Sequence, residues 1–82
     1  MATYWIDRKD FENKIEGKIG LGKNVEVLLM DAEDKQWLKA EVRPIPEPKE
    51  GGAVLKVLAD FGEPTDEEFY IEVLNTSSPE ED

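Results

Sequence analysis

The chain of 82 residues contains no cysteine and no histidine. Without cysteine it cannot form a disulfide or a thiolate metal site, and nothing in its cysteine usage indicates an oxidising compartment. Without histidine it lacks the side chain that most often acts as a general base and as a metal ligand. We therefore expect a chain that is not an enzyme and that uses neither a metal ion nor a cofactor.

Long apolar runs are also missing from the sequence. The longest, over residues 27–30, is far shorter than the roughly 20 apolar residues that a membrane-spanning helix needs. Residues 1–7 contain no basic stretch followed by an apolar run, so they do not resemble a signal peptide. These features predict a cytoplasmic protein without a membrane partner.

The last third of the chain contains no lysine or arginine. Residues 1–56 hold eleven acidic and all ten basic side chains, whereas residues 57–82 hold nine acidic side chains and no basic one. This asymmetry argues against direct binding of nucleic acid and favours a partner protein with a basic surface. Solubility alone is the other explanation for the excess charge, and the oligomeric state stays open.

Periodic patterns divide most of the chain into one helix and four strands. Asp7 is a residue type that caps helices, and Phe11 and Ile15 follow at a helical spacing, which predicts a helix over residues 7–17. Runs of apolar and β-branched residues predict strands over residues 24–30, 36–43, 53–61 and 69–74. The loop over residues 44–52 contains three prolines, which cannot donate hydrogen bonds within a sheet.

Short connections between these strands make neighbours antiparallel. We therefore expect an α+β fold, with a short N-terminal helix packed on a four-stranded antiparallel sheet. The alternative is an SH3-like small β-barrel with an N-terminal extension. Trp37 begins the second strand and is expected to be at least partly buried, at the centre of the sheet's apolar face. Residues 1–75 form a single compact domain, and residues 76–82 a flexible acidic tail, because no apolar residue follows Leu74.

Two motif-like patterns do not carry chemistry. Residues 17–23 match the spacing of a phosphate-binding loop, but Asn24 stands where that motif needs serine or threonine. The predicted order is also helix, glycines, strand, which is the reverse of what phosphate binding requires. The acidic residues after position 59 lack the spacing of a calcium-binding loop, which agrees with the expectation of no metal site.

The order of strand residues resembles a known family of small barrels. Residues 25–27, Trp37 with residues 39–42, residues 57–61 and residues 69–73 are similar to the strand succession of Tudor- and Agenet-type SH3-like barrels. The resemblance covers about residues 24–74 and implies a small barrel. It also implies a reader of methylated lysine or arginine, although the first turn, residues 31–34, contributes no aromatic residue to a cage.

The acidic segment over residues 60–72 is the predicted partner-binding face, with aromatic residues as apolar anchors. Its predicted site residues are Asp60, Phe61, Glu63, Asp66, Glu67, Glu68, Tyr70 and Glu72. Two functions remain open. The chain is either an acidic inhibitor or nucleic-acid-mimicking decoy that covers a basic surface, or an adaptor or reader module. The second would bind a peptide through a sheet edge or through an aromatic patch drawn from Trp37, Phe61 and Tyr70.

Overall fold

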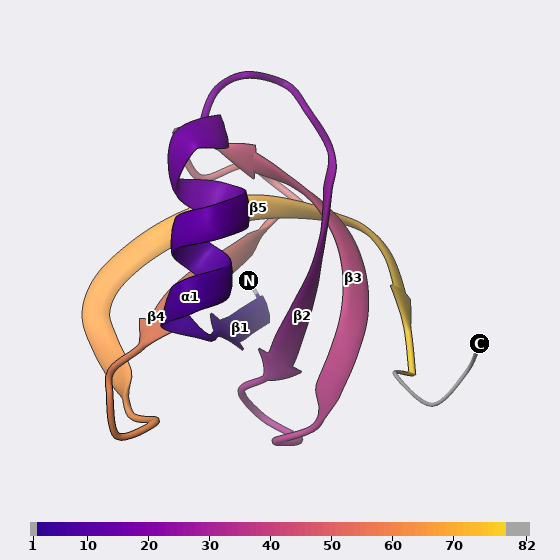
Figure 1. Ribbon diagram of the computed structural model, residues 1–82. Coiled ribbons are helices and arrows are strands. Elements are labelled where there is room, and N and C mark those ends of the chain that lie inside the picture. Colours follow the sequence, from indigo (N-terminus) through magenta and orange to yellow (C-terminus); the bar gives the residue numbers. More distant parts are fainter. Residues whose placement is uncertain (1, 79–82) are drawn as a thin grey trace.

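The computed structural model describes residues 2–78, which form a small barrel with one short helical segment (Figure 1). The strands in this part of the chain are β1 (Ala2–Ile6), β2 (Val25–Asp31), β3 (Trp37–Ile45), β4 (Ala53–Leu58) and β5 (Pro64–Ser77). The helical segment joins β1 to β2 and consists of α1 (Arg8–Asp10), η1 (Phe11–Ile15) and η2 (Glu16–Lys18).

The helical segment lies where the sequence predicts it. The carboxylate of Asp7 accepts a hydrogen bond from the backbone N–H of Lys9 at 3.2 Å, which satisfies one of the free donors at the start of the helix. Phe11 and Ile15 are buried and pack against the barrel core. The segment is followed by a turn in which Gly20 has a positive φ of 82°, a conformation that favours glycine.

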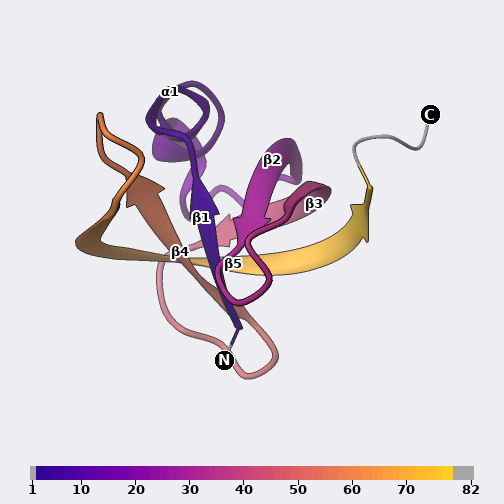
Figure 2. The same ribbon diagram turned by 90° about the horizontal axis from the view of Figure 1, so that it is seen from below.

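The barrel closes through β1. The strand order is β1-β2-β3-β5-β4, and β1 pairs with both β2 and β4, as Figure 2 shows. The pairing with β4 is parallel, which is possible because the chain between the two strands supplies a long crossover. The expected four-stranded antiparallel sheet is therefore wrong. The SH3-like alternative is closer, although its supposed N-terminal extension contributes the strand that closes the barrel.

The strand β5 lies between β3 and β4. Its first part pairs with β4, from Pro64 opposite Leu58 to Ile71 opposite Ala53, and its second part pairs with β3. The chain therefore passes from β3 to β4 without pairing the two, so the expected antiparallel pairing of strands that follow each other in the sequence is wrong for β3 and β4.

The ends of several strands differ from the prediction. In β3, Pro44 pairs opposite Ile71, beyond the predicted end at residue 43. β4 ends at Leu58 rather than at residue 61. β5 continues to Ser77, past Leu74, and Thr76 and Ser77 pair with β3. The division into a domain and a tail stays a prediction, because residues 79–82 lie outside the described residues.

The core lies inside the barrel, with the helical segment at one side. Its fully buried side chains are Ile6, Ile15, Leu29, Val42, Leu55 and Ile71. Ala40 and Val42 point into this core from β3, and strand alternation places Trp37 on the opposite face. Trp37 is 39% exposed and lies outside the core, so its expected central place on the apolar face is wrong.

Candidate partner-binding surfaces

Pairing of strands distributes the predicted acidic site residues over more than one face of the barrel. Phe69 packs against the core, so Glu68, Tyr70 and Glu72 lie on the outer face of β5. Glu67 instead lines a groove beside the helical segment. The segment that looks continuous in the sequence therefore does not form one acidic surface.

Basic side chains from the earlier part of the chain neutralise part of this charge. The ion pairs are Asp60 with Arg8 (3.7 Å), Glu68 with Lys56 (3.9 Å), and Glu72 with Arg43 (3.3 Å) and Lys49 (3.1 Å). The excess of acids counted along residues 57–82 thus overstates the negative charge that the folded barrel presents there.

Glu72 is the most strongly paired of these acids. Lys49 donates a hydrogen bond to Glu72 Oε2 at 3.1 Å, and Arg43 donates one to Glu72 Oε1 at 3.3 Å. The hydrogen bond from Lys49 is the largest cause that lowers the pKa of Glu72 below its ordinary value of 4.5. Partial burial opposes this effect, whereas the charges of Lys49 and Arg43 add to it.

Three of the predicted acids make no ion pair within residues 2–78: Glu63, Asp66 and Glu67. Asp66 and Glu67 belong to a bulge, where residues 65–67 of β5 lie opposite Val57 alone. Bulges of this kind turn side chains away from the regular sheet and are common at the rims of barrels. The unpaired acids therefore gather at one rim, near the turn between β4 and β5.

The predicted aromatic anchors are separated. Phe61 lies on the turn between β4 and β5 and is 96% exposed. Phe69 is partly buried, with its ring centroid 4.5 Å from that of Phe11. Tyr70 lies on the outer face of β5, opposite Ile45 on β3, and Trp37 is at the other end of β3. Trp37, Phe61 and Tyr70 thus do not form the single aromatic patch that the sequence suggested.

A different aromatic surface forms on the outside of β1, β2 and β3. Trp5 lies opposite Met30, and Met30 lies opposite Trp37, so the three side chains are neighbours on one face across three strands. Leu28 lies on the same outer face of β2 and is 42% exposed. The ammonium group of Lys35 is 3.8 Å from the ring centroid of Trp5, a cation–π contact. We call Trp5, Leu28, Met30 and Trp37 the outer aromatic face.

The outer aromatic face ends at a charged pair. On β4, Lys56 lies opposite Trp5, and on β5 its partner Glu68 lies opposite Lys56. Sequence reasoning missed this surface because it depends on the closing strand β1. The alternation of Ala40 and Val42 was the available signal that Trp37 points outward.

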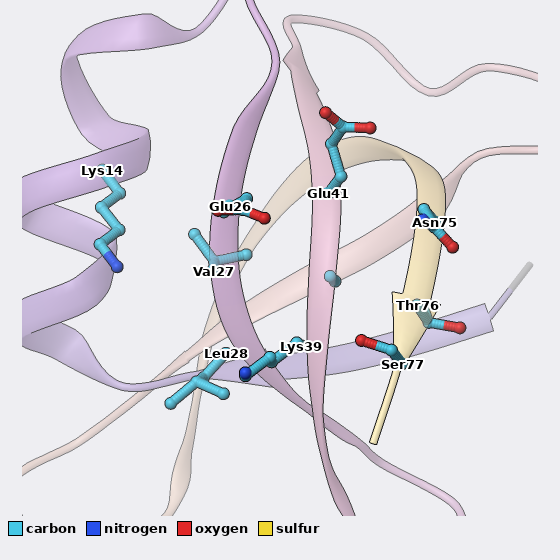
Figure 3. Close-up of a pocket in the computed structure, with 10 residues that line it drawn as sticks. Lys14, Glu26, Val27, Leu28, Lys39, Glu41, Asn75, Thr76 and Ser77 are labelled. Carbon is cyan, nitrogen blue, oxygen red and sulfur yellow. The ribbon is translucent and has the colours of Figure 1, made fainter. Parts of the chain in front are cut away.

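A shallow cavity of about 320 Å³ lies where the helical segment approaches β2, β3 and the end of β5 (Figure 3). Its charged side chains are Lys14, Glu26, Lys39 and Glu41. Glu26 and Glu41 are directly opposite each other on β2 and β3, an arrangement that repels. Two basic and two acidic side chains therefore give the lining no excess of either charge.

Within residues 2–78, no cluster of acidic side chains is arranged to hold a metal ion. No helix in the same part of the chain is long and apolar enough to cross a membrane. No protein-family model matches the chain, and neither a curated protein nor a solved structure matches it significantly.

Proposed function

We propose that this chain is a non-enzymatic protein-binding module, an adaptor or reader that holds a peptide segment of a partner protein on the outer aromatic face. The observation that carries the proposal is the row of Trp5, Met30 and Trp37 across three paired strands. Tryptophan and methionine are enriched in protein interfaces, and tryptophan is prominent among the residues that contribute most binding energy.

The setting of these side chains supports the proposal. They project from β1, β2 and β3, each of which is paired on both sides, so little backbone freedom would be lost on binding. The contact between Lys35 and Trp5 holds that ring in place. Trp37 is one of the largest apolar side chains, yet it is 39% exposed and does not belong to the buried core.

The sheet edge beside this face adds a second means of binding. Past Ile71, β5 pairs with β3 on one side, and within residues 2–78 it has no strand on the other. Its last paired residue, Ser77, lies opposite Lys39, close to Trp37 in β3. An extended peptide that pairs with such an edge gains main-chain hydrogen bonds, while neighbouring side chains supply specificity.

The acidic decoy is the second candidate function. It is favoured by Phe61, which is 96% exposed on the turn between β4 and β5. Glu63, two residues further along this turn, makes no ion pair within the described residues. An apolar tip among unpaired acids suits attachment to a basic surface. The ion pairs of Asp60, Glu68 and Glu72 weaken this candidate, because they reduce the charge available to attract such a surface.

The test is affinity capture from an extract of the source cells with three immobilised proteins. These are the parent, Trp37→Ala and Leu21→Ala. Leu21 is 59% exposed in the loop before β2 and serves as a matched control for loss of an exposed apolar side chain. We expect at least one protein to bind the parent and Leu21→Ala but not Trp37→Ala. If every captured protein binds all three equally, the outer aromatic face is not the binding site.

Salt separates the two candidates. Capture through the outer aromatic face should change little as ionic strength rises, because apolar contacts are not screened. Capture by an acidic decoy should fall steeply, and should also fall in a variant with Glu63→Gln, Asp66→Asn and Glu67→Gln. A partner lost from that variant but retained by Trp37→Ala would favour the decoy and refute the first proposal.

A further inference from the structure

The last part of β5 has an open edge. Residues 72–77 pair with β3 alone, and within residues 2–78 no strand lies on their other side. In Figure 2 this end of β5 extends away from β4 and from the helical segment. Successive residues of a strand direct their backbone N–H and C=O groups to opposite sides. Part of these groups therefore face away from β3, where they can pair with a strand of another molecule.

This edge lacks charge, although the chain as a whole is strongly acidic. Residues 73–79 are the longest run in the sequence without a charged side chain, in a chain whose net charge is −10. Glu72, at the start of the edge, is neutralised by ion pairs with Arg43 and Lys49. A basic partner finds nothing to attract it along such an edge, whereas a second acidic chain can approach it without bringing carboxylates together.

The usual devices that block a sheet edge are few at this one. Residues 72–77 contain neither lysine nor proline, which commonly prevent pairing between edges. A bulge is present, because Leu74 lies between the pairs that Val73 and Asn75 make with β3. Leu74 is also 41% exposed, so it offers one apolar side chain for burial. The edge is therefore open but short, which suits a weak contact.

We propose that two copies of this chain pair antiparallel along the edge, about a two-fold axis, and form a weak dimer. With the axis between Leu74 and Asn75, Glu72 lies opposite Ser77 of the second copy, and no two charged side chains are opposite each other. The antiparallel direction also keeps the acidic residues 80–82 of the two copies at opposite ends of the pair. Such an interface is self-complementary, as two-fold symmetry requires.

The proposed dimer does not depend on the outer aromatic face, which lies on β1, β2 and β3. It does involve the edge that is available to a partner peptide. Since one strand edge accepts one further strand, the second copy and a peptide on this edge exclude each other. Self-association would therefore limit access to the edge when the chain is concentrated.

The test is sedimentation of the full chain over a concentration series at two salt concentrations. A contact of six residues buries far less than the roughly 1,200 Å² of a stable interface, so we expect a dissociation constant of about 0.1–1 mM. Raising sodium chloride from about 0.01 M to about 0.5 M should tighten the dimer at least about threefold. The reason is that salt screens the repulsion between two chains of charge −10 and leaves the backbone hydrogen bonds unchanged.

Matched variants make the result specific to the edge. Asn75→Asp adds one negative charge at the edge, and Asn13→Asp adds the same charge at an exposed position of the helical segment. The first should weaken the dimer at least about fivefold, and the second less than about twofold. Because Asn75 lies opposite Glu41 on β3, Thr76→Glu is a second edge variant that places the charge opposite Ala40 instead. Circular dichroism checks that each variant is folded.

NMR spectra of the ¹⁵N-labelled chain at increasing concentration locate the contact. We expect shifts at the backbone amides of residues 72–78 and none at Trp5. A chain that stays monomeric at about 1 mM in high salt would overturn the proposal and leave the edge to a partner peptide. Equal weakening by Asn75→Asp and Asn13→Asp would also overturn it, since general repulsion would then control association.

Trp37→Ala separates this proposal from the proposed function. The variant should dimerise like the parent, because Trp37 lies on the outer aromatic face and not in β5. Loss of the dimer in Trp37→Ala would show that two copies meet through the outer aromatic face, which would overturn pairing along β5. A parental dimer combined with failed partner capture would leave the dimer standing and refute the proposed function alone.

Discussion

The outer aromatic face and the acidic segment over residues 60–72 arise in different ways within one small barrel. The first consists of Trp5, Leu28, Met30 and Trp37, which come from three strands and become neighbours through strand pairing. The second is contiguous in sequence, yet pairing divides it, since Glu67 turns towards the helical segment and Glu68 pairs with Lys56. Strand register can therefore bring together side chains that are separate in the sequence. It can also divide a run of charged residues that is continuous in the sequence.

The same contrast separates two kinds of interaction. Apolar side chains on regular strands bind by burial, which depends little on salt. Carboxylates on a bulge and a turn act over longer distances, and they mainly raise association rates. A variant that affects one surface and spares the other therefore tests the division directly.

The largest expected effect comes from Ile71, which supports β5 where that strand changes partners. Ile71 is fully buried and lies opposite both Pro44 and Ala53. Ile71→Ala should lower the free energy of unfolding by about 2–5 kcal/mol, the usual range for truncation of a buried isoleucine. Urea denaturation measures this change. A loss below about 1 kcal/mol would mean that Ile71 does not stabilise both halves of β5.

The next effect concerns Gly52, at the start of β4. A Cβ atom at this position would lie 3.0 Å from the carbonyl oxygen of Lys49 and 3.1 Å from that of Ile71. Because both neighbours are backbone atoms, Gly52→Ala should destabilise the barrel by about 1–3 kcal/mol. Gly17→Ala is the control, since it meets nothing within 4 Å and should be neutral or stabilising in the helical segment. Equal thermal midpoints for the two variants would contradict the close approach of the loop to β5.

Trp37→Ala should have a smaller effect on stability. Trp37 lies outside the core and is 39% exposed, so the variant loses a cross-strand contact with Met30 and part of the burial of a full core tryptophan, about 1–2 kcal/mol in all. Chemical denaturation, with near-parental far-ultraviolet circular dichroism, checks this expectation. A loss of 3–5 kcal/mol, typical of a buried tryptophan, would move Trp37 into the core and remove it from the outer aromatic face.

The smallest effect is the pH dependence contributed by Glu72. Its pKa is lowered in the folded chain, chiefly by the hydrogen bond from Lys49. The ionised carboxylate therefore stabilises the fold at pH above its ordinary value of 4.5, and this contribution is lost as pH falls through the lowered value. Glu72→Gln should reduce the drop in stability between pH 5 and about pH 3. An unchanged pH profile, measured by thermal denaturation, would show that the pair with Lys49 is too exposed to matter.

Local patterns predicted the elements better than their arrangement. The helix is evident from Asp7, Phe11 and Ile15, because capping and helical spacing are local features. The closing strand β1 was not predicted as part of the barrel, because a parallel pair with β4 joins residues far apart in sequence. The place of β5 between β3 and β4 has the same cause, since no local signal fixes which strands are neighbours.

The candidate sites show the same limit. The size of Trp37 suggested burial, whereas the alternation of Ala40 and Val42 placed it outside, and the alternation was the better guide. The charge asymmetry is visible in the sequence, but its ion pairs with Arg8, Lys56 and Lys49 are not, because these side chains come from other elements.

The most direct test of the central claim compares two variants against one captured partner. The first is Trp37→Ala, and the second combines Glu63→Gln, Asp66→Asn and Glu67→Gln. With both folded, isothermal titration at physiological salt should show at least about a tenfold loss of affinity for Trp37→Ala, as for a tryptophan that anchors an interface. The second variant should lose less than about threefold, because acids at a rim affect association rate more than affinity. The opposite order, with Trp37→Ala binding like the parent, would contradict the proposal that the outer aromatic face is the binding site.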